Sequence, residues 1–458
     1  DRVAIQQGNT RWFVVSYFAV LRAGAVAVPI NPALTTAETA LLLAHSGARV
    51  ILSDGVSSDT SRGAAEAVGT CAVLVADSGD WRAMLTQGRR TAFVEAVTPR
   101  EALAVIMFTA GTGAQAKGAM LTHGALRANV ELLLALQGPS AIRADDRVLL
   151  VVPMFHIYGL NAVLTLAIAA GARTILLDRF EPGEALSAIR DGAVSVVAGT
   201  PAMYLAWSRL PELGAGLGTM RLFTSGGSSL PAAVLEEFTA RAGIGIYEGY
   251  GMTEAGPVVS TTLVSGLPKA GSVGRALPGV EIMLVDGFGD RVADGDPGEV
   301  CVRSPSLFSG YWPNGAGGPD AQGWFRSGDV GFLDGNDDLH IVDRRREVIV
   351  VNGFTVYPRE VEATIEQLPA VAEAAVVAAD ERSGEAVLAL VVPRPGAVLS
   401  ATEIERHCAQ HLARFKCPTS VRIVQTLPHS ASGGIAKGRL AEVHGVIDPT
   451  DLPPGLPS

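Results

Sequence analysis

The sequence contains few cysteines and few charged residues for its length. Its 458 residues include 4 cysteines, and only 18% are Asp, Glu, Lys or Arg. The cysteines are scattered, without a CxxC pair or the spacing of zinc ligands, which argues against a disulfide scaffold and a structural metal site. A reducing, cytoplasmic setting is therefore expected.

The sequence also lacks an excess of positive charge. Lys and Arg number 36 and Asp and Glu number 46, for a formal net charge of −10. Nucleic-acid binding depends on clustered Lys and Arg, so this acidic chain is a poor candidate for general nucleic-acid binding. Anionic ligands stay possible, because backbone amides and a few placed cations can bind a phosphate.

The longest uncharged stretch is interrupted by polar residues and Pro, so a membrane span is only a distant alternative there. The stretch 151–172 lacks Asp, Glu, Lys and Arg, but it contains Pro153, His156 and Asn161. A spanning helix needs roughly 20 predominantly apolar residues, so this stretch predicts a core strand, a loop and a buried helix. The chain opens without Met and directly on a strand-like run, so we expect upstream sequence to be missing.

Hydrophobic residues make up 48% of the chain, enough for two or three domains. Short β-branched runs alternate with Ala- and Leu-rich runs, as at 25–30, 37–46 and 48–53, and this predicts βαβ units with parallel sheets flanked by helices. Residues 309–323 are rich in Gly, Pro, Asn and Asp and predict an exposed loop.

A different pattern follows this loop. Strand-like runs flank the turn sequence 334–337 and predict a hairpin centred between Gly335 and Asn336. A compact order of helix, strand, strand, helix and strand then predicts a small α+β unit. The predicted fold is α/β, with a large N-terminal domain at 1–342, a hinge at 343–347 and a small mobile C-terminal domain at 348–458.

Four segments carry residues suited to nucleotide chemistry. The first, 108–118, reads Phe-Thr-Ala-Gly-Thr-Gly-Ala-Gln-Ala-Lys-Gly. Its small residues let backbone amides approach phosphate oxygens, and its Lys adds a charge. It is not a Walker loop, because Gly-Lys-Ser/Thr does not follow at the required offset. Taken alone, an ordinary flexible turn is slightly favoured.

The second segment, 247–254, reads Tyr-Glu-Gly-Tyr-Gly-Met-Thr-Glu. An aromatic ring beside glycines offers a stacking face, and Thr-Glu offers oxygen ligands to a phosphate-bound Mg²⁺. A strand end with a solvated Glu is an equal alternative.

The third segment, 323–329, ends in Asp329, which the predicted hairpin places opposite position 342 and near Arg344. This pair suits a sugar diol, although a surface ion pair of little energetic value is the alternative. The fourth segment, 353–362, marks a helix start at Pro358.

In this order, and together with Pro153-Met154-Phe155-His156 and Ser225-Gly226-Gly227, these segments closely resemble the adenylate-forming superfamily of acyl-CoA synthetases, peptide-synthetase adenylation domains and luciferases. The resemblance runs from Asp1 to about Leu440, and the segments 22–29 and 350–362 are most similar to fatty acyl-CoA synthetases. It implies ATP, Mg²⁺ and coenzyme A as reactants or cofactors and a carboxylic acid as substrate. It also implies a small domain that rotates between the two half-reactions.

The resemblance implies a role for individual residues. The β- and γ-phosphates would be bound by Thr109, Gly111, Thr112 and Lys117. Tyr250 would stack on adenine. Gly226, Gly227 and Gly251 would line the pockets for the base and for the acyl group. Thr253 would contact the α-phosphate and Glu254 the Mg²⁺.

Other implied roles concern the sugar, the acid and the hinge. Asp329 would bind the ribose hydroxyls with help from Arg344. Arg346 matches the hinge position, and Gly353 matches the loop that faces the site during thioester formation. His156 matches a position beside the acyl carboxylate, with a buried structural His as the alternative.

The sequence departs from the family pattern in two places. Residues usual in the phosphate loop are replaced by Ala110, Gly113, Ala114 and Ala116. Near the C-terminus, Gly434 stands where the family has a Lys that reaches the α-phosphate and the carboxylate. Losing one such donor typically costs about 2.7–4 kcal/mol of transition-state stabilisation. Lys437 is a candidate replacement on a loop, although on a regular strand it would face the wrong way.

Four explanations of Gly434 stay open: an engineered substitution, a natural enzyme slow in its first step, replacement by Lys437, or a non-catalytic relative. The preferred prediction is an ATP-dependent acyl-CoA ligase for a fatty or similarly apolar acid. An adenylation domain that serves a carrier protein and a non-catalytic acyl- or nucleotide-binding protein are the alternatives.

Overall fold

The computed structural model describes residues 1–69, 71–89, 96–109, 117–136, 141–344, 349–351, 354–356, 358–381, 384–412, 414–429, 434–437 and 439–440. Contacts divide the chain into two compact units. The first unit comprises Asp1–Met283, Cys301–Arg326 and Asp334–His340, and the second comprises Leu284–Val300, Ser327–Leu333 and Ile341–Ser458. The predicted domain limits at 342 and 348 stay a prediction.

One sheet of the first unit has the strand order β4-β3-β1-β2-β5-β6. Its strands are β1 (Arg2–Gln6), β2 (Val26–Pro29), β3 (Val50–Ser53), β4 (Ala72–Val75), β5 (Leu103–Thr109) and β6 (Lys117–Thr122). They run parallel except for β6, and Val3 lies between Ala27 and Val50. Ala4 and Ile5 are fully buried, as expected for a parallel sheet covered on both faces.

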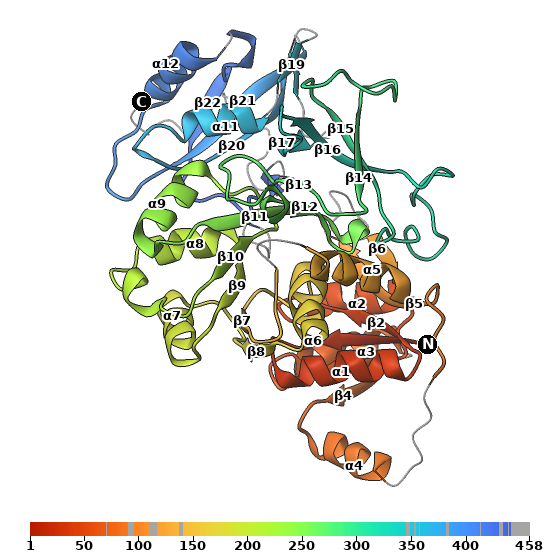
Figure 1. Cartoon of the computed structure of the whole chain (residues 1–458). Coiled ribbons are helices and arrows are strands. Elements are labelled where there is room, and N and C mark those ends of the chain that lie inside the picture. Colours follow the sequence, from red (N-terminus) through yellow and green to blue (C-terminus); the bar gives the residue numbers. More distant parts are fainter. Residues whose placement is uncertain are drawn as a thin grey trace, which may run out of the picture. The chain divides into compact units, whose positions relative to one another are not determined.

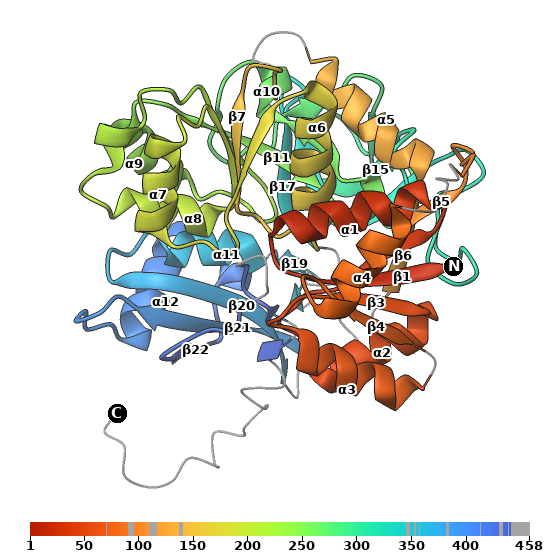
Figure 2. The same cartoon turned by 90° about the horizontal axis from the view of Figure 1, so that it is seen from below.

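Three helices cover this sheet: α1 (Arg11–Arg22), α2 (Thr36–Ser46) and α3 (Ser58–Val68). Helix α4 (Gly79–Gly88) follows the edge strand β4 and buries only Trp81. In Figure 2, α1 lies on one side of the strands and α2 and α3 lie on the other. Helix α2 begins at a capping box of Thr35 and Glu38 and ends at Gly47, whose φ of 63° suits a residue without Cβ. The local sequence therefore sets the ends of this helix.

A second sheet of the first unit has the order β13-β12-β11-β10-β9-β7-β8. Its strands are β7 (Arg147–Leu150), β8 (Arg173–Leu176), β9 (Val196–Gly199), β10 (Leu222–Ser225), β11 (Ile246–Gly251), β12 (Val258–Thr261) and β13 (Arg275–Ala276). The helical segments around it are α5 (His123–Leu134), η1 (Tyr158–Thr165), α6 (Leu166–Ala170), α7 (Pro182–Asp191), α8 (Pro201–Ser208), η2 (Leu213–Gly216), α9 (Ala232–Ala242), η3 (Thr253–Ala255) and α10 (Thr262–Ser265).

Figure 1 shows α7, α8 and α9 on one side of strands β7 to β10, with α5 and α6 on the other. The rings of Tyr204, Phe223 and Phe238 meet edge to face at centroid distances of 5.0–5.9 Å between α8, β10 and α9. All three side chains are fully buried, so they form the core of this face.

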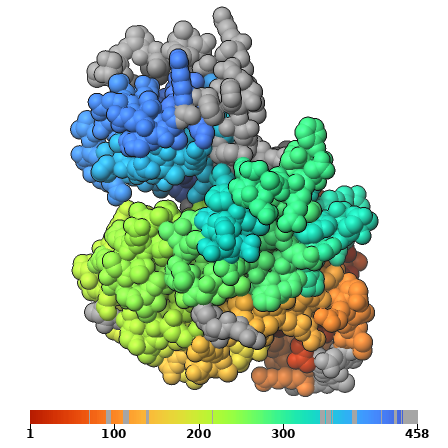
Figure 3. Space-filling view, turned by 45° about the horizontal axis from the view of Figure 1, so that its top comes forward, coloured from red at the N-terminus to blue at the C-terminus, as the bar shows by residue number. Residues whose placement is uncertain are grey.

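A further sheet has the order β14-β15-β16-β17, from β14 (Glu281–Val285), β15 (Gly298–Arg303), β16 (Phe325–Leu333) and β17 (Leu339–Arg344). The later elements are β18 (Ile349–Val351), β19 (Phe354–Val356), α11 (Pro358–Ile365), β20 (Val371–Glu381), β21 (Gly384–Pro393), α12 (Ala401–His411), η4 (Arg414–Lys416) and β22 (Ser420–Ile423). Strands β20 and β21 are antiparallel, and β22 runs parallel to β21. Val361, Val376 and Ile404 are among their buried core residues, and Figure 3 shows this part in blue as one closely packed body.

The structure confirms the predicted α/β class, with sheets flanked by helices and a separate small α+β unit. The apolar stretch 151–172 forms a loop after β7, followed by η1 and α6. In the part of the chain that the structure describes, no helix combines the length and apolarity needed to cross a lipid bilayer.

The predicted loop at 309–323 is confirmed, because this segment contains turns and no named helix or strand, and most of its residues are exposed or half-buried. Its first residues also lie along the open edge of β6, where Ser309 N and Trp312 N donate to the carbonyls of Met120 and Gly118. The predicted hairpin forms between β16 and β17, but with a different centre. The hairpin turn is centred on Asn336, because Asp334 N donates to Asp338 O at 3.1 Å. This is half a residue beyond the predicted centre, since the Asp334 carboxylate also accepts bonds from Asn336 N and Asp338 N and adds a residue to the turn.

Candidate active site

Three groups of predicted site residues follow the carboxyl ends of parallel strands. His156 follows β7, Gly226 and Gly227 follow β10, and Thr253 follows β11. Strands β7, β9, β10 and β11 run parallel, so their carboxyl ends share one edge. The chain leaves β7 toward β8 but leaves β9 in the opposite direction, toward β10. Diverging loops of this kind open the crevice in which α/β proteins bind ligands.

The glycine loop after β10 packs against an aromatic ring. A Cβ added to Gly226 would lie 3.3 Å from Cζ of Tyr158, and Gly227 has a φ of 88°. The hydroxyl of Tyr158 shares a 3.3 Å hydrogen bond with Oγ1 of Thr224. Burial raises the pKa of Tyr158 to about 12, so the ring is uncharged. A Cβ at position 226 would require the Tyr158 ring to shift by a few tenths of an ångström, and the positive φ of Gly227 favours glycine.

His156 lies two residues before Tyr158, and its ring keeps an exposed surface. Desolvation by the neighbouring protein lowers the pKa of His156, so the ring is neutral near pH 7. Tyr158 N donates to Nδ1 at 3.3 Å, which places the ring proton on Nε2. The position of His156 beside the acyl carboxylate stays a prediction.

The loop 152–156 is attached to the first sheet by Asn9. The Asn9 side chain donates from Nδ2 to Val152 O and accepts at Oδ1 from Met154 N, both at 2.9 Å. Only 5% of Asn9 is exposed. These two bonds fix the backbone on both sides of Pro153, and with it the start of the segment that carries His156.

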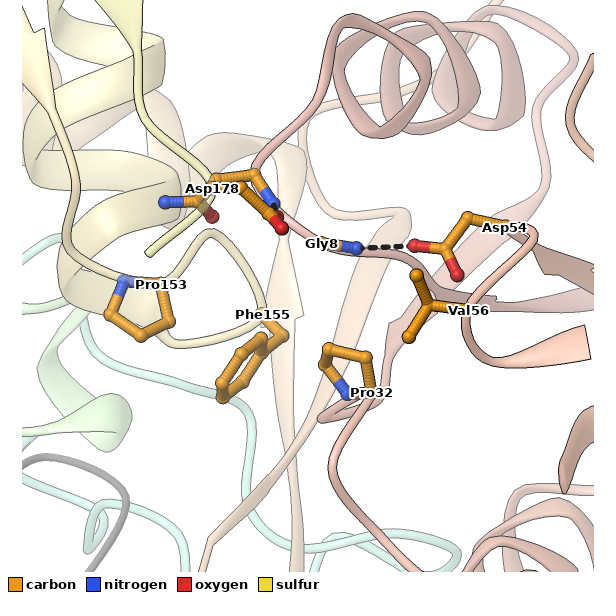
Figure 4. A pocket seen from close by; sticks show the side chains of 8 residues that line it. Gly8, Pro32, Asp54, Val56, Pro153, Phe155 and Asp178 are labelled. Atoms are coloured by element: carbon orange, nitrogen blue, oxygen red, sulfur yellow. Dashed lines mark hydrogen bonds between the residues drawn. The ribbon is translucent and has the colours of Figure 1, made fainter. Parts of the chain in front are cut away.

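A shallow hollow of about 160 Å³ lies beside this attachment, among the loops that follow β1, β2, β3, β7 and β8. Figure 4 shows Pro153 and Phe155 on one side of it and Pro32 and Val56 on the other. Gly8 N donates to Oδ2 of Asp54 at 2.8 Å across its floor. The hollow contains none of the residues predicted to bind nucleotide.

Thr253 and Glu254 lie in the short turn η3, which is fixed by contacts between the residues before it and Pro257 after it. A Cβ on Gly251 would lie 2.2 Å from the carbonyl oxygen of Pro257, so only glycine fits there. Met252 N donates to the same Pro257 oxygen at 3.0 Å. The turn therefore folds back closely on β11, which places Thr253 and Glu254 at its carboxyl end.

Two fully buried asparagines hold the chain after Glu254. Asn129, on α5, donates to Val258 O at 2.8 Å and accepts from Val258 N at 3.3 Å. Asn161, on η1, donates to Gly256 O at 2.6 Å and to Leu126 O at 3.0 Å. Asn129 uses both halves of its amide and Asn161 donates twice from Nδ2, so these buried side chains fix the backbone that they contact.

Glu254, in the turn η3, and Lys117, at the start of β6, both contact the side chain of Tyr311. The Tyr311 hydroxyl donates to Oε1 of Glu254 at 2.6 Å. The ammonium group of Lys117 lies 5.0 Å from the centroid of the same ring, within the range of a cation–π contact. The proposed metal ligand and the last cation of the phosphate segment therefore contact one residue.

The phosphate segment is described only at its two ends. Thr109 ends β5 and pairs with Lys117 at the start of β6, and its hydroxyl donates to Lys117 O at 3.3 Å. Gly111 and Thr112 lie outside the described residues, as do the departures Ala110, Gly113, Ala114 and Ala116. The antiparallel pairing of β5 and β6 brings Thr109 and Lys117 side by side.

The predicted sugar and hinge residues belong to the second unit. Asp329 lies on β16, half buried, and its backbone N–H donates to Oγ of Ser327 at 3.0 Å. Arg344 lies on β17, but its side chain is outside the described part, and Arg346 and Gly353 lie outside it entirely. Their roles stay predictions, and so does the role of Tyr250 as a stacking face on β11.

Lys437 is engaged in the second unit. Its ammonium group lies 2.8 Å from Oε1 of Glu362, and the two side chains are 12% and 10% exposed. The same Glu362 oxygen accepts a bond from Val376 N at 2.7 Å. Burial raises the pKa of Glu362, and the nearby Lys437 partly offsets this rise. Gly434 lies just before the bridge residue Ile435, which pairs with His429.

The Glu254 carboxylate suits a magnesium ion whose other ligands are the phosphates of a nucleotide and water. Within the described residues, no three His, Cys, Asp or Glu side chains gather as a complete metal site. Mg²⁺ typically takes one or two carboxylates together with substrate phosphates and water. Glu254 offers one carboxylate, and the bond from Tyr311 to Oε1 orients it. This donor set suits a metal that arrives with a nucleotide.

Sequence reasoning missed Asn9, Asn129, Asn161 and Tyr311. Asn161 did carry a signal, because it is an amide in an otherwise apolar stretch, where a polar side chain needs a buried partner. Tyr311 carried a weaker one, since an aromatic pair at 311–312 is unusual in an exposed loop. The partners of these residues lie far along the chain, so no spacing rule points to them.

The family profile of AMP-binding enzymes matches residues 1–312, and the profile of the AMP-binding enzyme C-terminal domain matches residues 360–433. A feruloyl-CoA synthase from Amycolatopsis is 34% identical over 96% of this chain and 88% of its own length. A long-chain-fatty-acid–CoA ligase from Bacillus subtilis is 30% identical over 96% and 85%.

Solved structures of similar fold agree with the family matches. The ATP-bound MatB of Rhodopseudomonas palustris is similar with a TM-score of 0.89 at 32% identity, over 97% of this chain and 88% of its own. A benzoate CoA ligase from Burkholderia xenovorans has a TM-score of 0.85 at 29% identity, over 96% and 89%. Both family profiles and the named relatives show the same family membership, and the crevice at the ends of β7, β10 and β11 agrees with it. The chain therefore belongs to the adenylate-forming superfamily of AMP-binding enzymes, as an AMP-forming acid–thiol ligase.

Proposed function

We propose that this protein activates an apolar carboxylic acid with ATP and transfers the acyl group to coenzyme A, and that it does so in the cytoplasm. The relatives carry names for different acids, from ferulate and benzoate to long-chain fatty acids. A fatty acid is the preferred substrate, because segments 22–29 and 350–362 are most similar to fatty acyl-CoA synthetases. An aryl acid is the alternative.

In the first half-reaction, a carboxylate oxygen attacks the α-phosphorus of ATP, and pyrophosphate leaves. A carboxylate is a poor electrophile, and the resulting acyl-adenylate has AMP as a good leaving group. Thr253 is proposed to bind the α-phosphate and Lys117 the terminal phosphates. Mg²⁺ held at Glu254 would neutralise phosphate charge. His156, neutral and protonated on Nε2, can donate a hydrogen bond to the acid without adding charge.

In the second half-reaction, the thiolate of coenzyme A attacks the acyl carbon and AMP leaves, which gives the thioester. Asp329 is proposed to hold the ribose of the nucleotide through its carboxylate. Arg346 and Gly353 are proposed to act as hinge and as part of the loop that faces the site in this step. A small domain that rotates about a hinge would let one site perform both half-reactions.

The observation that carries this proposal is the meeting of Lys117 and Glu254 at Tyr311. The resemblance to the adenylate-forming superfamily implies phosphate binding for Lys117 and metal binding for Glu254, from two separate motifs. In the structure both contact one side chain. ATP carrying a Mg²⁺ on its phosphates would satisfy the two residues together.

Gly434 supports a second candidate, a non-catalytic acyl- or nucleotide-binding protein. The cation usual at this position is absent, and Lys437 is ion-paired with Glu362. A preorganised cation is worth about 2.7–4 kcal/mol in the transition state, so adenylation would be slow without being abolished. The first candidate is preferred, because the remaining binding residues support chemistry on a bound nucleotide.

The test is the release of AMP by the purified protein across a panel of alkyl and aryl acids, with and without coenzyme A. Acid-dependent AMP release that requires coenzyme A supports the ligase. Acid-dependent pyrophosphate release without use of coenzyme A supports an adenylation enzyme for another acceptor. ATP binding without any acid-dependent release supports the binding protein.

A further inference from the structure

Tyr311 joins two residues that the reaction requires, and neither its sequence context nor the family match assigns it a role. It follows Gly310 in the segment 309–312, which lies along the open edge of β6. We propose that Tyr311 is a positioning residue that sets the Glu254 carboxylate and the Lys117 ammonium group relative to each other for a magnesium-bound nucleoside triphosphate. The proposal rests on the function proposed above, since that function gives Glu254 and Lys117 their ligands.

The backbone around Tyr311 is held on both sides. Met120 N donates to Gly310 O at 3.1 Å, and Trp312 N donates to Gly118 O at 2.8 Å. Ala119 and Tyr311 form the bridge between these two bonds. Since Lys117 begins β6, Tyr311 is anchored to the same strand as the lysine that its ring contacts.

The same segment is also bonded to the Glu254 turn. Phe308 N donates to the backbone carbonyl of Glu254 at 2.8 Å, while the Tyr311 hydroxyl donates to its carboxylate. The ring of Phe308 packs edge to face on Tyr311 at 4.9 Å. Backbone and side chain of Glu254 are thus fixed by residues three positions apart, so the carboxylate has a set orientation before any ligand binds.

The two contacts of Tyr311 use different parts of its side chain. The hydroxyl orients Glu254, and the face of the ring attracts the Lys117 ammonium group. An outer hydrogen bond to a metal-binding carboxylate typically changes metal affinity by about 10–100-fold. A cation–π contact at an exposed lysine contributes a smaller effect on the position of the charge. The two contributions can therefore be separated by substitution.

Tyr311→Phe keeps the ring and removes the hydroxyl, whereas Tyr311→Leu removes both contacts. The measurement is ATP affinity by isothermal titration calorimetry, with and without Mg²⁺, on the full chain. The ratio of the two affinities reports the metal site without any need for turnover. Tyr311→Phe should lower this ratio by about 10-fold or more and leave metal-free ATP affinity unchanged. Tyr311→Leu should also weaken metal-free ATP binding by about two- to fivefold.

Tyr204→Phe is the matched control, because the Tyr204 hydroxyl donates to the carbonyl of Thr224 within the core of the first unit. It removes one buried tyrosine hydrogen bond elsewhere and should leave the Mg²⁺ ratio unchanged. Circular dichroism establishes that each variant is folded. If Tyr311→Leu does not fold, the Tyr311→Phe result decides on its own.

The outcomes separate this proposal from the proposed function. If wild-type protein binds ATP more tightly with Mg²⁺ and Tyr311→Phe shows the same ratio, the role of Tyr311 is overturned while the ligase proposal stands. If wild-type ATP affinity does not respond to Mg²⁺, the metal role of Glu254 fails and the Tyr311 proposal fails with it. A reduced ratio in Tyr311→Phe but not in Tyr204→Phe supports the positioning role.

Discussion

Lys437 and Glu362 form an ion pair in the second unit, with 2.8 Å between Nζ and Oε1. Both side chains are largely buried, so removing either partner would leave a charge without compensation, at a cost of about 3–5 kcal/mol. For Lys437 to replace the cation missing at Gly434, it would have to leave this pair. The structure therefore favours a structural role for Lys437.

We expect that Gly434→Lys increases acid-dependent pyrophosphate release by about 100-fold, because it supplies one charged donor to the transition state. The second half-reaction, started from acyl-adenylate and coenzyme A, should change little. Pyrophosphate release and thioester formation are measured separately. A variant that folds, binds ATP and still releases no pyrophosphate with any acid would favour the non-catalytic candidate.

Lys437→Met is the companion to this variant. If the pair with Glu362 is structural, the substitution lowers the free energy of unfolding and leaves any residual adenylation per folded molecule unchanged. Loss of the residual adenylation without loss of stability would instead assign Lys437 to the reaction.

Asp329→Ala should weaken ATP binding by about 1.5–3 kcal/mol, the range for hydrogen bonds to a charged group. The proposed cause is the loss of bonds from the ribose hydroxyls to the carboxylate. Calorimetric titration with ATP and with 2′,3′-dideoxy-ATP measures the effect. The wild-type protein should prefer ATP, and the variant should lose that preference; equal affinities for ATP in both proteins would remove the ribose assignment.

Tyr158→Ala should shift the preference among acids toward longer or bulkier ones by about 10-fold or more in kcat/KM. The reason is the Tyr158 ring beside Gly226, which occupies space next to the glycine loop of the crevice. Tyr158→Phe is the matched control, since it keeps the size and loses only the bond to Thr224. An unchanged acid profile in Tyr158→Ala would place the acyl group elsewhere.

Asp146 should contribute to the acid sensitivity of the first unit. Burial alone would raise the pKa of Asp146, but bonds from Arg221, Ser195 and the backbone of Arg143 outweigh it and lower that pKa. A carboxyl whose folded pKa is lowered stabilises the fold above its unfolded pKa of about 3.9. That contribution is lost as the pH falls through the folded pKa.

Asp146→Asn removes this pH dependence and, because it leaves Arg221 without its buried partner, lowers the free energy of unfolding at pH 7 by about 3–5 kcal/mol. Denaturant titrations at pH 7, 5 and 3 measure both effects. The control is Asp191→Asn, which removes an exposed pair with Arg190 and should change stability by less than about 1 kcal/mol. The same change in stability and in pH dependence in the two variants would contradict the proposed role of the Asp146–Arg221 pair.

The sequence by itself determined the elements and most of the motifs. Alternating apolar runs predicted β2, α2 and β3 to within two residues at each end, because burial and helix capping act over a few neighbouring residues. The resemblance to the adenylate-forming superfamily indicated the glycines at 226, 227 and 251. At Gly251 the structure adds the physical reason, because a Cβ there would lie 2.2 Å from the carbonyl oxygen of Pro257.

Tertiary structure alone decided which distant residues act together. Glu254 contacts Tyr311, Asn161 contacts Gly256, and Lys437 contacts Glu362, each across a large separation in sequence. Such contacts depend on strand order and on how segments pack over an open sheet edge, and local periodicity contains neither. The sequence could therefore predict the chemistry of single residues, while the long-range hydrogen bonds of the folded chain decided how those residues are held.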